Sequence, residues 1–429
     1  MKTVAFITLG CKVNQYETNA MTQQFIEKGY EVVDHTEKAD IYIVNTCTVT
    51  NMSDRKSRQM LRRVKELNQE AIVVACGCYA QVAKEELEKI EEINLVLGNN
   101  EKKDIVEHVE KYIESNIPEV QTEDVMNQRE FVEFGDITFT EKTRAVIKIQ
   151  DGCDRFCSYC IIPYARGRVR SRKPEHILSE IQKIAKEGIK EVVITGIHIA
   201  SYGKDFRQEY RLINLLEDMN QIEGIERIRL GSIEPLLITE EFVSRLEKLS
   251  KVCHQFHLSL QSGCDETLKR MNRRYSTEQF KEITELLRKT FEDAILTTDI
   301  IVGFPGESEE EFEKTYAFLK DIKFYKMRVF KYSQRKGTKA AVMPNQIDGN
   351  KKEERSRRLI ELSNKNEKTY NEKYIGKEVQ VLFEEEKHGV WQGHTKNYIL
   401  AHYKTEENME NKMVTLKCVD AEDEHIVVN

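Results

Sequence analysis

Three cysteines lie close together in the segment IQDGCDRFCSYCIIPYARG. They are Cys153, Cys157 and Cys160, with C-x3-C-x2-C spacing. Thiolates are soft ligands that suit iron–sulfur clusters, and three on one short loop can bind three irons of a cubic cluster. The fourth iron then keeps an open position, as a metal site that performs chemistry requires. The alternative is a zinc knuckle completed by a distant residue, but zinc sites usually contain a second C-x2-C or His pair, and none follows here.

A second group of cysteines follows three separate strand-like runs. They are Cys11 in TLGCKVNQYET, Cys47 in VNTCTVTN, and Cys76 and Cys78 in ACGCYAQ. Because ligands of parallel sheets bind beyond the carboxyl ends of the strands, these thiols are predicted to form a second metal site. We expect Cys78, which lies past the glycine, to be the third ligand, and Cys76 to belong to the strand. A single buried cysteine is most simply a small apolar side chain, and we interpret the remaining three in this way: Cys253, Cys264 and Cys418.

Composition favours an intracellular enzyme. The start MKTVAFITLG has no small-residue cleavage site, and no apolar run reaches the length of a membrane span, so we expect neither secretion nor a membrane anchor. Ten scattered cysteines in 429 residues do not form a secreted disulfide framework, and in a reducing cytoplasm they indicate metal binding or catalysis. The net charge of −7 does not by itself indicate a nucleic-acid binder.

The elements that must position these cysteines form two αβ series. In the first, strand-like runs at 4–9, 41–45, 71–75 and 94–97 alternate with helical patterns at 14–28, 54–67, 84–90 and 102–113. Such units predict a doubly wound parallel sheet. The second series has strands near 144–150, 191–195, 227–230, 254–260, 294–302 and 326–332, separated by helical patterns. It predicts a partial (β/α)6 barrel with its site at the C-terminal ends of the strands.

The chain resembles the radical S-adenosylmethionine (SAM) methylthiotransferases over essentially its whole length. The resemblance rests on GCKVNQYET, NTCTVTN, GCYAQ, the DGCDRFCSYCIIPYARG segment, LQSG, DIIVGFPGE and the turn Lys336-Gly337-Thr338. It implies an N-terminal methylthiotransferase domain at 1–115, a linker at 116–140 and a radical SAM barrel at 141–350. A connecting helix at 351–373 and a small all-β barrel of the TRAM type at 374–429 would follow.

The resemblance also implies the cofactors, which are two 4Fe–4S clusters and SAM. Cys153, Cys157 and Cys160 match the ligands of the SAM-binding cluster. Cys11, Cys47 and Cys78 match those of the auxiliary cluster that handles sulfur, whereas Cys76 has no counterpart in the family pattern. Three further residues are candidates for SAM contacts. Tyr159, between two ligands, would pack on the adenine, and Glu234 and Asp299, at strand ends, would make polar contacts.

Members of the family differ in substrate. The segments NTCTVTNMSDRKSRQ and CSYCIIPYARGRVRSR look most like the branch that adds a methylthio group to C2 of N6-threonylcarbamoyladenosine at tRNA position 37, in the anticodon loop. Other branches modify isopentenyladenosine of tRNA or an aspartate of a ribosomal protein, and a non-catalytic iron–sulfur electron carrier is a more remote alternative. A C2–H bond is inert to acid–base chemistry, so the implied mechanism generates a radical from SAM. It also requires an electron donor such as flavodoxin or ferredoxin, and a sulfur donor.

RNA binding would need local groups of basic residues. There are three: Arg166, Arg168, Arg170, Arg172 and Lys173; Lys269, Arg270, Arg273 and Arg274; and Arg58, Arg62 and Arg63. Residues 374–429, by contrast, hold six Lys, no Arg and eleven Asp or Glu. RNA contacts there would rely on stacking by aromatics such as Trp391, Tyr398 and Tyr403, unless these side chains fill the core of the module.

Overall fold

The first αβ series forms a parallel sheet. The computed structural model describes residues 2–138 and 143–429, so the expected boundary between linker and barrel, at 140 and 141, lies outside the described residues. Six strands pair in the order β2-β1-β3-β4-β5-β6, all parallel. They are β1 (Thr3–Thr8), β2 (Glu31–Val32), β3 (Ile41–Thr46), β4 (Ile72–Gly77), β5 (Leu95–Leu97) and β6 (Glu119–Gln121). The last strand lies within the segment expected to be a linker.

Helices cover both faces of this sheet, as the doubly wound prediction requires. On one face α1 (Lys12–Glu27) and α5 (Ile105–Ser115) pack on a core that includes Cys76. On the other face lie α2 (Asn51–Leu67) and α3 (Cys78–Val82). Two short helices lie between α3 and α5 along the chain: α4 (Lys84–Leu87) and η1 (Glu101–Asp104). Successive residues of β4 alternate between the two cores, as a strand buried on both faces must.

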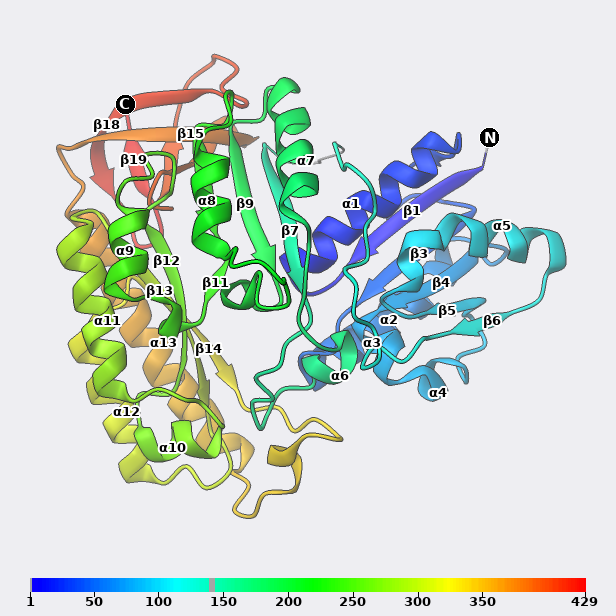
Figure 1. Ribbon diagram of the computed structural model, residues 1–429, viewed down its shortest axis with the longest axis horizontal. Coiled ribbons are helices and arrows are strands. Elements are labelled where there is room, and N and C mark those ends of the chain that lie inside the picture. The colour runs from blue at the N-terminus through cyan, green and yellow to red at the C-terminus, as the bar shows by residue number, and fades with distance from the viewer. Residues whose placement is uncertain (1, 139–142) are drawn as a thin grey trace.

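The second αβ series forms two four-stranded sheets, β10-β9-β7-β8 and β11-β12-β13-β14. Their strands are β7 (Arg144–Asp151), β8 (Arg170–Ser171), β9 (Glu191–Gly196), β10 (Arg227–Leu230), β11 (Ser232–Ile233), β12 (Gln255–Gln261), β13 (Ile295–Val302) and β14 (Lys326–Lys331). Only Gly231 separates β10 from β11, so the chain passes directly from one sheet into the other. Apart from the antiparallel β8, the strands are parallel and curve into the predicted partial barrel (Figure 1).

Helices surround the outside of this barrel. They are α7 (Pro174–Lys186), α8 (Leu212–Asn220), α9 (Glu240–Leu246), α11 (Thr277–Thr290) and α12 (Glu309–Ile322), whereas the short α6 (Ile162–Arg166), η2 (Ile199–Ser201), η3 (Pro235–Leu237) and α10 (Asp265–Arg270) lie in the segments that follow β7, β9, β11 and β12. In β13, Leu296 and Ile300 are buried in the core that these helices share, whereas Thr297 and Asp299 are half-buried. By strand alternation, the polar residues face the inside of the barrel.

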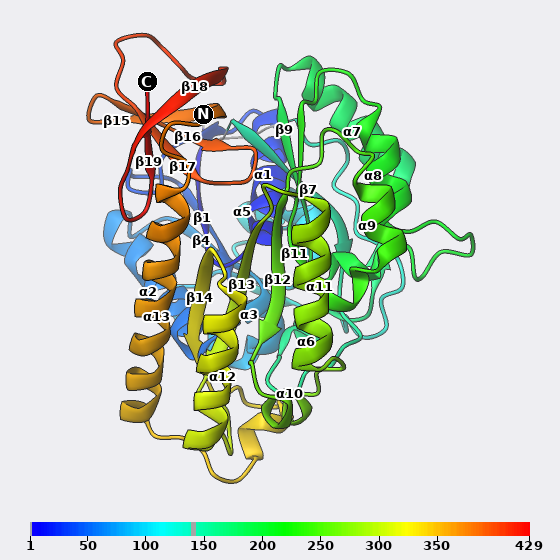
Figure 2. The same ribbon diagram turned by 90° about the vertical axis from the view of Figure 1, so that its left-hand side faces the viewer.

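The last part of the chain is a helix followed by a closed β-barrel. After η4 (Lys339–Val342), α13 (Gly349–Glu372) runs along β14 (Figure 2). The barrel has the order β15-β16-β17-β19-β18, formed by β15 (Glu378–Lys387), β16 (Val390–Thr395), β17 (Leu400–Tyr403), β18 (Met413–Ala421) and β19 (Ile426–Val428). Trp391 is buried in its core, and Tyr403 packs against that core. These two aromatics therefore serve packing rather than RNA stacking.

Part of the docking of the C-terminal barrel is through its main-chain groups. Arg227 donates hydrogen bonds to the carbonyl oxygens of His394 at 2.9 Å and Gln380 at 2.8 Å. Arg229 reaches the carbonyl of Lys396 at 3.1 Å. Because these arginines lie on β10, the module sits against the central barrel on the side where its strands begin. Among the described residues, no helix has the length and apolar character of a membrane span.

Candidate functional site

Cys11, Cys47 and Cys78 lie together beyond the carboxyl ends of β1, β3 and β4. Two glycines make this close approach possible. Gly10 has φ +99°, and a Cβ atom added there would lie 2.8 Å from the Sγ of Cys47. Gly77 has φ +100°, and a Cβ atom there would lie 2.6 Å from a side-chain oxygen of Asn45. Both φ angles are also in the region that favours glycine. Each turn therefore requires glycine because of its backbone conformation and because a Cβ atom would collide with a neighbour.

Two asparagines tie the loops of this first group together. The side chain of Asn14 donates to the carbonyls of Leu9 at 2.7 Å and Thr46 at 3.0 Å. Asn45 donates in turn to the carbonyl of Asn14 at 2.9 Å. The ends of β1 and β3 and the first turn of α1 are therefore one hydrogen-bonded unit.

Cys78, rather than Cys76, faces the other two thiols. Cys11 and Cys47 each interact electrostatically with Cys78. Cys76 is fully buried and belongs to the core beneath α1 and α5, on the opposite face of the sheet from α3. Cys78 therefore stays the proposed third ligand of this group. Burial raises the pKa of Cys76 to about 12, as it does for an apolar-packed thiol.

Cys153, Cys157 and Cys160 lie on the loop that follows β7. The amide of Cys153 donates to the carbonyl of Gly167, and that of Cys160 to the carbonyl of Cys157, both at 3.0 Å. Phe156, inside the loop, has φ +47°, which is strained for a bulky residue. The side chain of Asn272 holds it by donating to its carbonyl at 3.0 Å. The loop is thus fixed by contacts to α6 and to the turn after α10.

Both groups fit an iron–sulfur cluster better than a single metal ion. In the described part of the chain, no three His, Cys, Asp or Glu side chains converge closely enough to bind one ion. A cubic cluster has a different requirement, because each cysteine binds a different iron. Within each group the thiols are near enough to raise one another's pKa, after the larger effect of burial, as seen for Cys47 and Cys160.

Arg166 links the two groups. It ends α6, just after the second cysteine loop, and its Nε donates to the Sγ of Cys78 at 3.2 Å. The same guanidinium hydrogen-bonds Asn14 at 2.6 Å, Asp151 at 3.2 Å and Glu17. Arg166 is fully buried, yet its anionic neighbours outweigh burial and raise its pKa well above the usual value. A permanent positive charge therefore lies between the two thiol groups.

The three candidate SAM residues lie at the top of the barrel or on its inner face. Glu234 pairs with Arg273 at 2.8 Å and lies 3.6 Å from the Nε2 of His198. Burial works against its ionisation, but these neighbours hold the pKa of Glu234 below its usual value. Arg273 also donates to the Sγ of Cys157 at 3.4 Å, which connects Glu234 to the second thiol group. The sequence analysis named Arg273 only as one of a group of basic residues, and His198, in the segment GIHIASYG at the end of β9, was not predicted as a site residue.

Tyr159 and Asp299 have different surroundings. Tyr159 packs edge-on against Phe304, with 6.4 Å between ring centres, and joins a small apolar cluster beside the thiol loop. Asp299 lies on the inner face of β13, where one carboxylate oxygen is 3.2 Å from the Nε2 of His257. Its other oxygen has no hydrogen-bond partner. Of the three, Tyr159 and Glu234 lie beside the second thiol group.

The basic groups behave differently from the expectation based on charge alone. Of the five basic residues after the second thiol group, three are interior and at most 1% exposed: Arg166, Arg170 and Arg172. Arg172, for example, pairs with the buried Glu180 at 2.5 Å. In the second basic group, Arg270 pairs with Glu311 at 2.6 Å and Arg273 with Glu234. These arginines hold elements together and do not form an RNA surface.

The basic face of α2 remains available. A shallow surface pocket on this helix is lined by Arg55, Arg58, Gln59, Arg62, Arg63 and Glu66. Asp54, at the start of the helix, pairs with Arg335 of the loop after β14 at 2.7 Å. Arg335 also donates to Thr48, one residue after Cys47, at 2.6 Å. The basic helix is thus attached to the rim of the central barrel and to the first thiol group.

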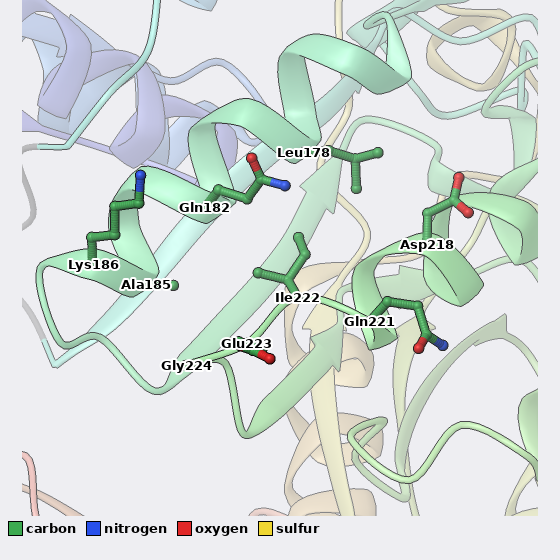
Figure 3. Close-up of a pocket in the computed structure, with 9 residues that line it drawn as sticks. All are labelled: Leu178, Gln182, Ala185, Lys186, Asp218, Gln221, Ile222, Glu223 and Gly224. Carbon is green, nitrogen blue, oxygen red and sulfur yellow. The ribbon is translucent and has the colours of Figure 1, made fainter.

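A further pocket opens between α7 and α8 (Figure 3). Its lining comprises Leu178, Gln182, Ala185, Lys186, Asp218, Gln221, Ile222, Glu223 and Gly224. It includes none of the clustered thiols or the charged residues around them. The pocket lies on the outer, helical side of the central barrel and is separate from the candidate site.

Comparison with known proteins places both halves of this site in known families. A model described as the radical SAM superfamily matches residues 147–319, and one described as uncharacterized protein family UPF0004 matches residues 3–98. Among solved structures, the radical S-adenosylmethionine methyltransferase TsrM from Kitasatospora setae, with cobalamin and a [4Fe-4S] cluster bound, has a TM-score of 0.57. The match covers 80% of this chain and 77% of that one at 16% identity, which shows a shared fold.

Curated proteins match along nearly the whole chain. Threonylcarbamoyladenosine tRNA methylthiotransferase MtaB of Bacillus subtilis is 42% identical over 427 residues, covering 98% of this chain and 94% of that protein. A tRNA-2-methylthio-N(6)-dimethylallyladenosine synthase of Caldicellulosiruptor saccharolyticus is 36% identical over 431 residues, covering 98% and 90%. Such identity over both thiol groups and the C-terminal barrel shows that the chain belongs to the radical SAM methylthiotransferase family.

Proposed function

We propose that this protein adds a methylthio group to C2 of N6-threonylcarbamoyladenosine at position 37 of tRNA, with two 4Fe–4S clusters and SAM as cofactors. The proposal is supported by the relatives named for this reaction, at 42% identity in both Bacillus subtilis and Aquifex aeolicus. The dimethylallyladenosine synthases, at 36% identity, make the same chemistry on that nucleoside the second candidate.

The observation that carries this proposal is the contact of Arg166 with Cys78. A methylthio transfer must bring the place where SAM is cleaved and the place where sulfur is held to one nucleoside. Arg166 comes from the segment that begins with the C-x3-C-x2-C loop, and it hydrogen-bonds a thiol of the other group. The two groups are therefore held in one fixed relationship, as transfer between them requires.

Each group of thiols has its own role in the proposal. Cys153, Cys157 and Cys160 bind the cluster that holds SAM, and Cys11, Cys47 and Cys78 bind the auxiliary cluster. When bound, the clusters and SAM supply the one-electron chemistry and the sulfur site that the protein alone lacks. Tyr159, Glu234 and Asp299 are proposed to contact SAM, and Arg273 orients Glu234 beside the SAM-binding cluster.

The proposed reaction defines the partners. It takes place on the anticodon loop, and the basic face of α2 supports contact with the phosphates of that RNA. It also consumes electrons and a sulfur atom, so a reductant such as flavodoxin or ferredoxin and a sulfur donor are required. Such a protein would act in the cytoplasm, where its tRNA substrate resides.

Nucleoside analysis of tRNA tests the proposal. Total tRNA from cells with and without the gene is digested, and its modified nucleosides are quantified by mass spectrometry. Loss of the methylthio derivative of threonylcarbamoyladenosine, with accumulation of its precursor, is the expected result. Loss of the dimethylallyladenosine derivative instead would support the second candidate.

An unchanged nucleoside profile would contradict both candidates and direct attention to the ribosomal-protein aspartate. A second assay distinguishes a methylthiotransferase with any of these three substrates from an electron carrier. The reduced, anaerobic methylthiotransferase would release 5′-deoxyadenosine from SAM, whereas an electron carrier would release none.

A further inference from the structure

Six charged side chains are buried beside the first thiol group, where the N-terminal domain meets the central barrel. They come from α1, η1, β7, α6 and β8. The cations are Lys102, Lys148, Arg166 and Arg170, and the carboxylates are Glu17 and Asp151. None of the six side chains is more than 6% exposed, so water does little to screen their charges.

The charges in this group do not balance. Within residues 2–138 and 143–429, every ion pair of the four cations is made with Glu17 or Asp151. Four cations and two carboxylates leave an excess of two positive charges. Buried charge without full compensation is unfavourable, and a further negative charge placed next to it is stabilised.

Two chains of contacts bring this excess positive charge to Cys78. The Nε of Arg166 donates directly to the Sγ of Cys78 at 3.2 Å. Lys102 donates to the side-chain oxygen of Asn99 at 2.9 Å, and the Nδ2 of Asn99 lies 3.8 Å from the same sulfur. Asn99 and Cys78 are each 4% exposed. The sulfur of Cys78 is therefore at the edge of the charged group and is shielded from water with it.

The reduction potential of an iron–sulfur cluster depends on the net charge around it and on hydrogen bonds to its sulfurs. Reduction adds one electron and thus one negative charge, which an excess of buried cations stabilises. We propose that this charged group raises the reduction potential of the auxiliary cluster bound by Cys11, Cys47 and Cys78. The inference rests on the proposed function, which assigns a cluster to these thiols, and it adds the residues that tune that cluster.

The test measures the potential of the auxiliary cluster alone. The full chain carrying Cys153→Ala, Cys157→Ala and Cys160→Ala is reconstituted and titrated anaerobically with dithionite and redox mediators, and electron paramagnetic resonance reports the reduced cluster. Lys102→Gln lowers the excess charge and is expected to lower the potential. Glu17→Gln increases the excess charge and is expected to raise it. Each shift should be at least about tenfold in the equilibrium constant for reduction, or about 59 mV for one electron.

Shifts of opposite sign distinguish an effect of charge from structural damage, because both substitutions remove a member of the same ion-pair network. A potential is a property of the clusters that are present, so a partial loss of iron does not obscure it. Lys148→Gln and Asp151→Asn form a second pair of the same kind if a variant of the first pair retains no cluster. Arg168→Gln is the control, since Arg168 is 46% exposed, and it should leave the potential unchanged.

The inference is overturned if both members of a pair shift the potential in the same direction, or if neither shifts it more than Arg168→Gln does. Iron analysis separates this failure from failure of the proposed function. If the protein without the second group of cysteines binds no iron, the auxiliary cluster and the proposed function are wrong. If it holds about four irons, and the unaltered enzyme methylthiolates threonylcarbamoyladenosine, an unchanged potential in the variants contradicts only the tuning.

Discussion

Arg166 and Cys78 are 88 residues apart in the chain, and a 3.2 Å hydrogen bond joins the Nε of the first to the Sγ of the second. Arg166 belongs to the central barrel, and Cys78 belongs to the N-terminal sheet. The contact is buried and is continued by Glu17, which also pairs with Lys102 at 2.5 Å and Lys148 at 2.7 Å. A charged network of this kind defines one arrangement of two domains, because shifting either would leave buried charges unpaired.

Arg166→Gln is therefore expected to affect stability and cluster content together. Removal of one partner from a buried ion network typically costs about 3–5 kcal/mol of unfolding free energy. Denaturant unfolding and iron per chain are the measurements. Arg168→Gln is the matched control, since Arg168 is nearby but 46% exposed. Normal unfolding and full iron content in Arg166→Gln would show that the link is dispensable.

Replacing single cysteines should separate ligands from structural thiols. The reconstituted protein is expected to hold about eight irons, four in each cubic cluster. Cys78→Ala should reduce this to about four, whereas Cys76→Ala should retain all of them, with a modest loss of stability from the cavity it leaves. Iron analysis and visible absorption report the outcome. A loss of iron in Cys76→Ala with none in Cys78→Ala would reverse the assignment of the third ligand.

The turn before Cys78 should not tolerate a side chain. Gly77→Ala places a Cβ atom 2.6 Å from the Asn45 side chain and strains a φ of +100°. We expect a loss of at least about 2 kcal/mol in unfolding free energy, together with the auxiliary cluster. Gly29→Ala is the control for strain alone, because Gly29 has φ +83° but no atom within 4 Å of an added Cβ. That variant should lose only about 1 kcal/mol and keep its iron.

Acid is expected to weaken the docking of the C-terminal barrel. His394 and Glu384 are 2.6 Å apart at this interface, and Glu384 also pairs with Arg144. Burial lowers the pKa of His394 below 6.5, so the neutral ring stabilises the fold above that pH, and this contribution is lost as pH falls through the lowered value. For Glu384, burial opposes ionisation, but His394 and Arg144 hold its pKa below 4.5, so its contribution is lost at still lower pH.

Unfolding free energy measured by denaturant from pH 7.5 to pH 5 should therefore decline. In His394→Gln the decline below about pH 6.5 should be shallower. His35→Gln, at a half-exposed histidine, is the control. An identical pH profile for His394→Gln and the unaltered protein would exclude this histidine as the source.

The α2 arginines should contribute affinity without selectivity. Arg62→Ala and Arg63→Ala are each expected to weaken binding of an anticodon stem-loop RNA by the same factor whether position 37 is modified or not, and to lower the slope of log affinity against log salt by about one. Lys412→Ala, on the acidic C-terminal module, should leave both unchanged. If the salt dependence is unaltered in the α2 variants, the phosphates of the RNA contact another part of the protein.

The sequence predicted the convergence of thiols because strand order in a parallel sheet is a strong constraint. Cys11, Cys47 and Cys78 each follow a strand, and adjacent parallel strands deliver such residues to one edge. The position of Cys78 past a glycine predicted that it leaves the strand, and it begins α3, whereas Cys76 lies within β4. The three expected architectures, a doubly wound sheet, a partial barrel and a closed β-barrel, are all present.

Groups of basic residues in the sequence did not predict where an RNA-binding surface lies, and the reason is physical. A run of arginines gives the sign of the charge but not the partners: Glu17, which pairs with Arg166, lies 149 residues away in α1, and Glu133, which pairs with Arg172, lies 39 residues away. Tyr398 is half-buried beneath Arg144 and Arg229, whose guanidinium carbons lie 5.2 and 4.6 Å from the centre of its ring. Long-range pairing of this kind has no local signature.

The docking of the C-terminal barrel has a consequence for how this module can evolve. Arg227 and Arg229 recognise main-chain carbonyls, which every residue type provides. Substitutions on the outer surface of the module therefore leave these hydrogen bonds intact as long as the path of the backbone is kept. Charges on that outer surface are therefore free to change, which fits the eleven acidic residues of 374–429 and the proposal that α2 contacts RNA. Attachment and recognition are thus inherited separately.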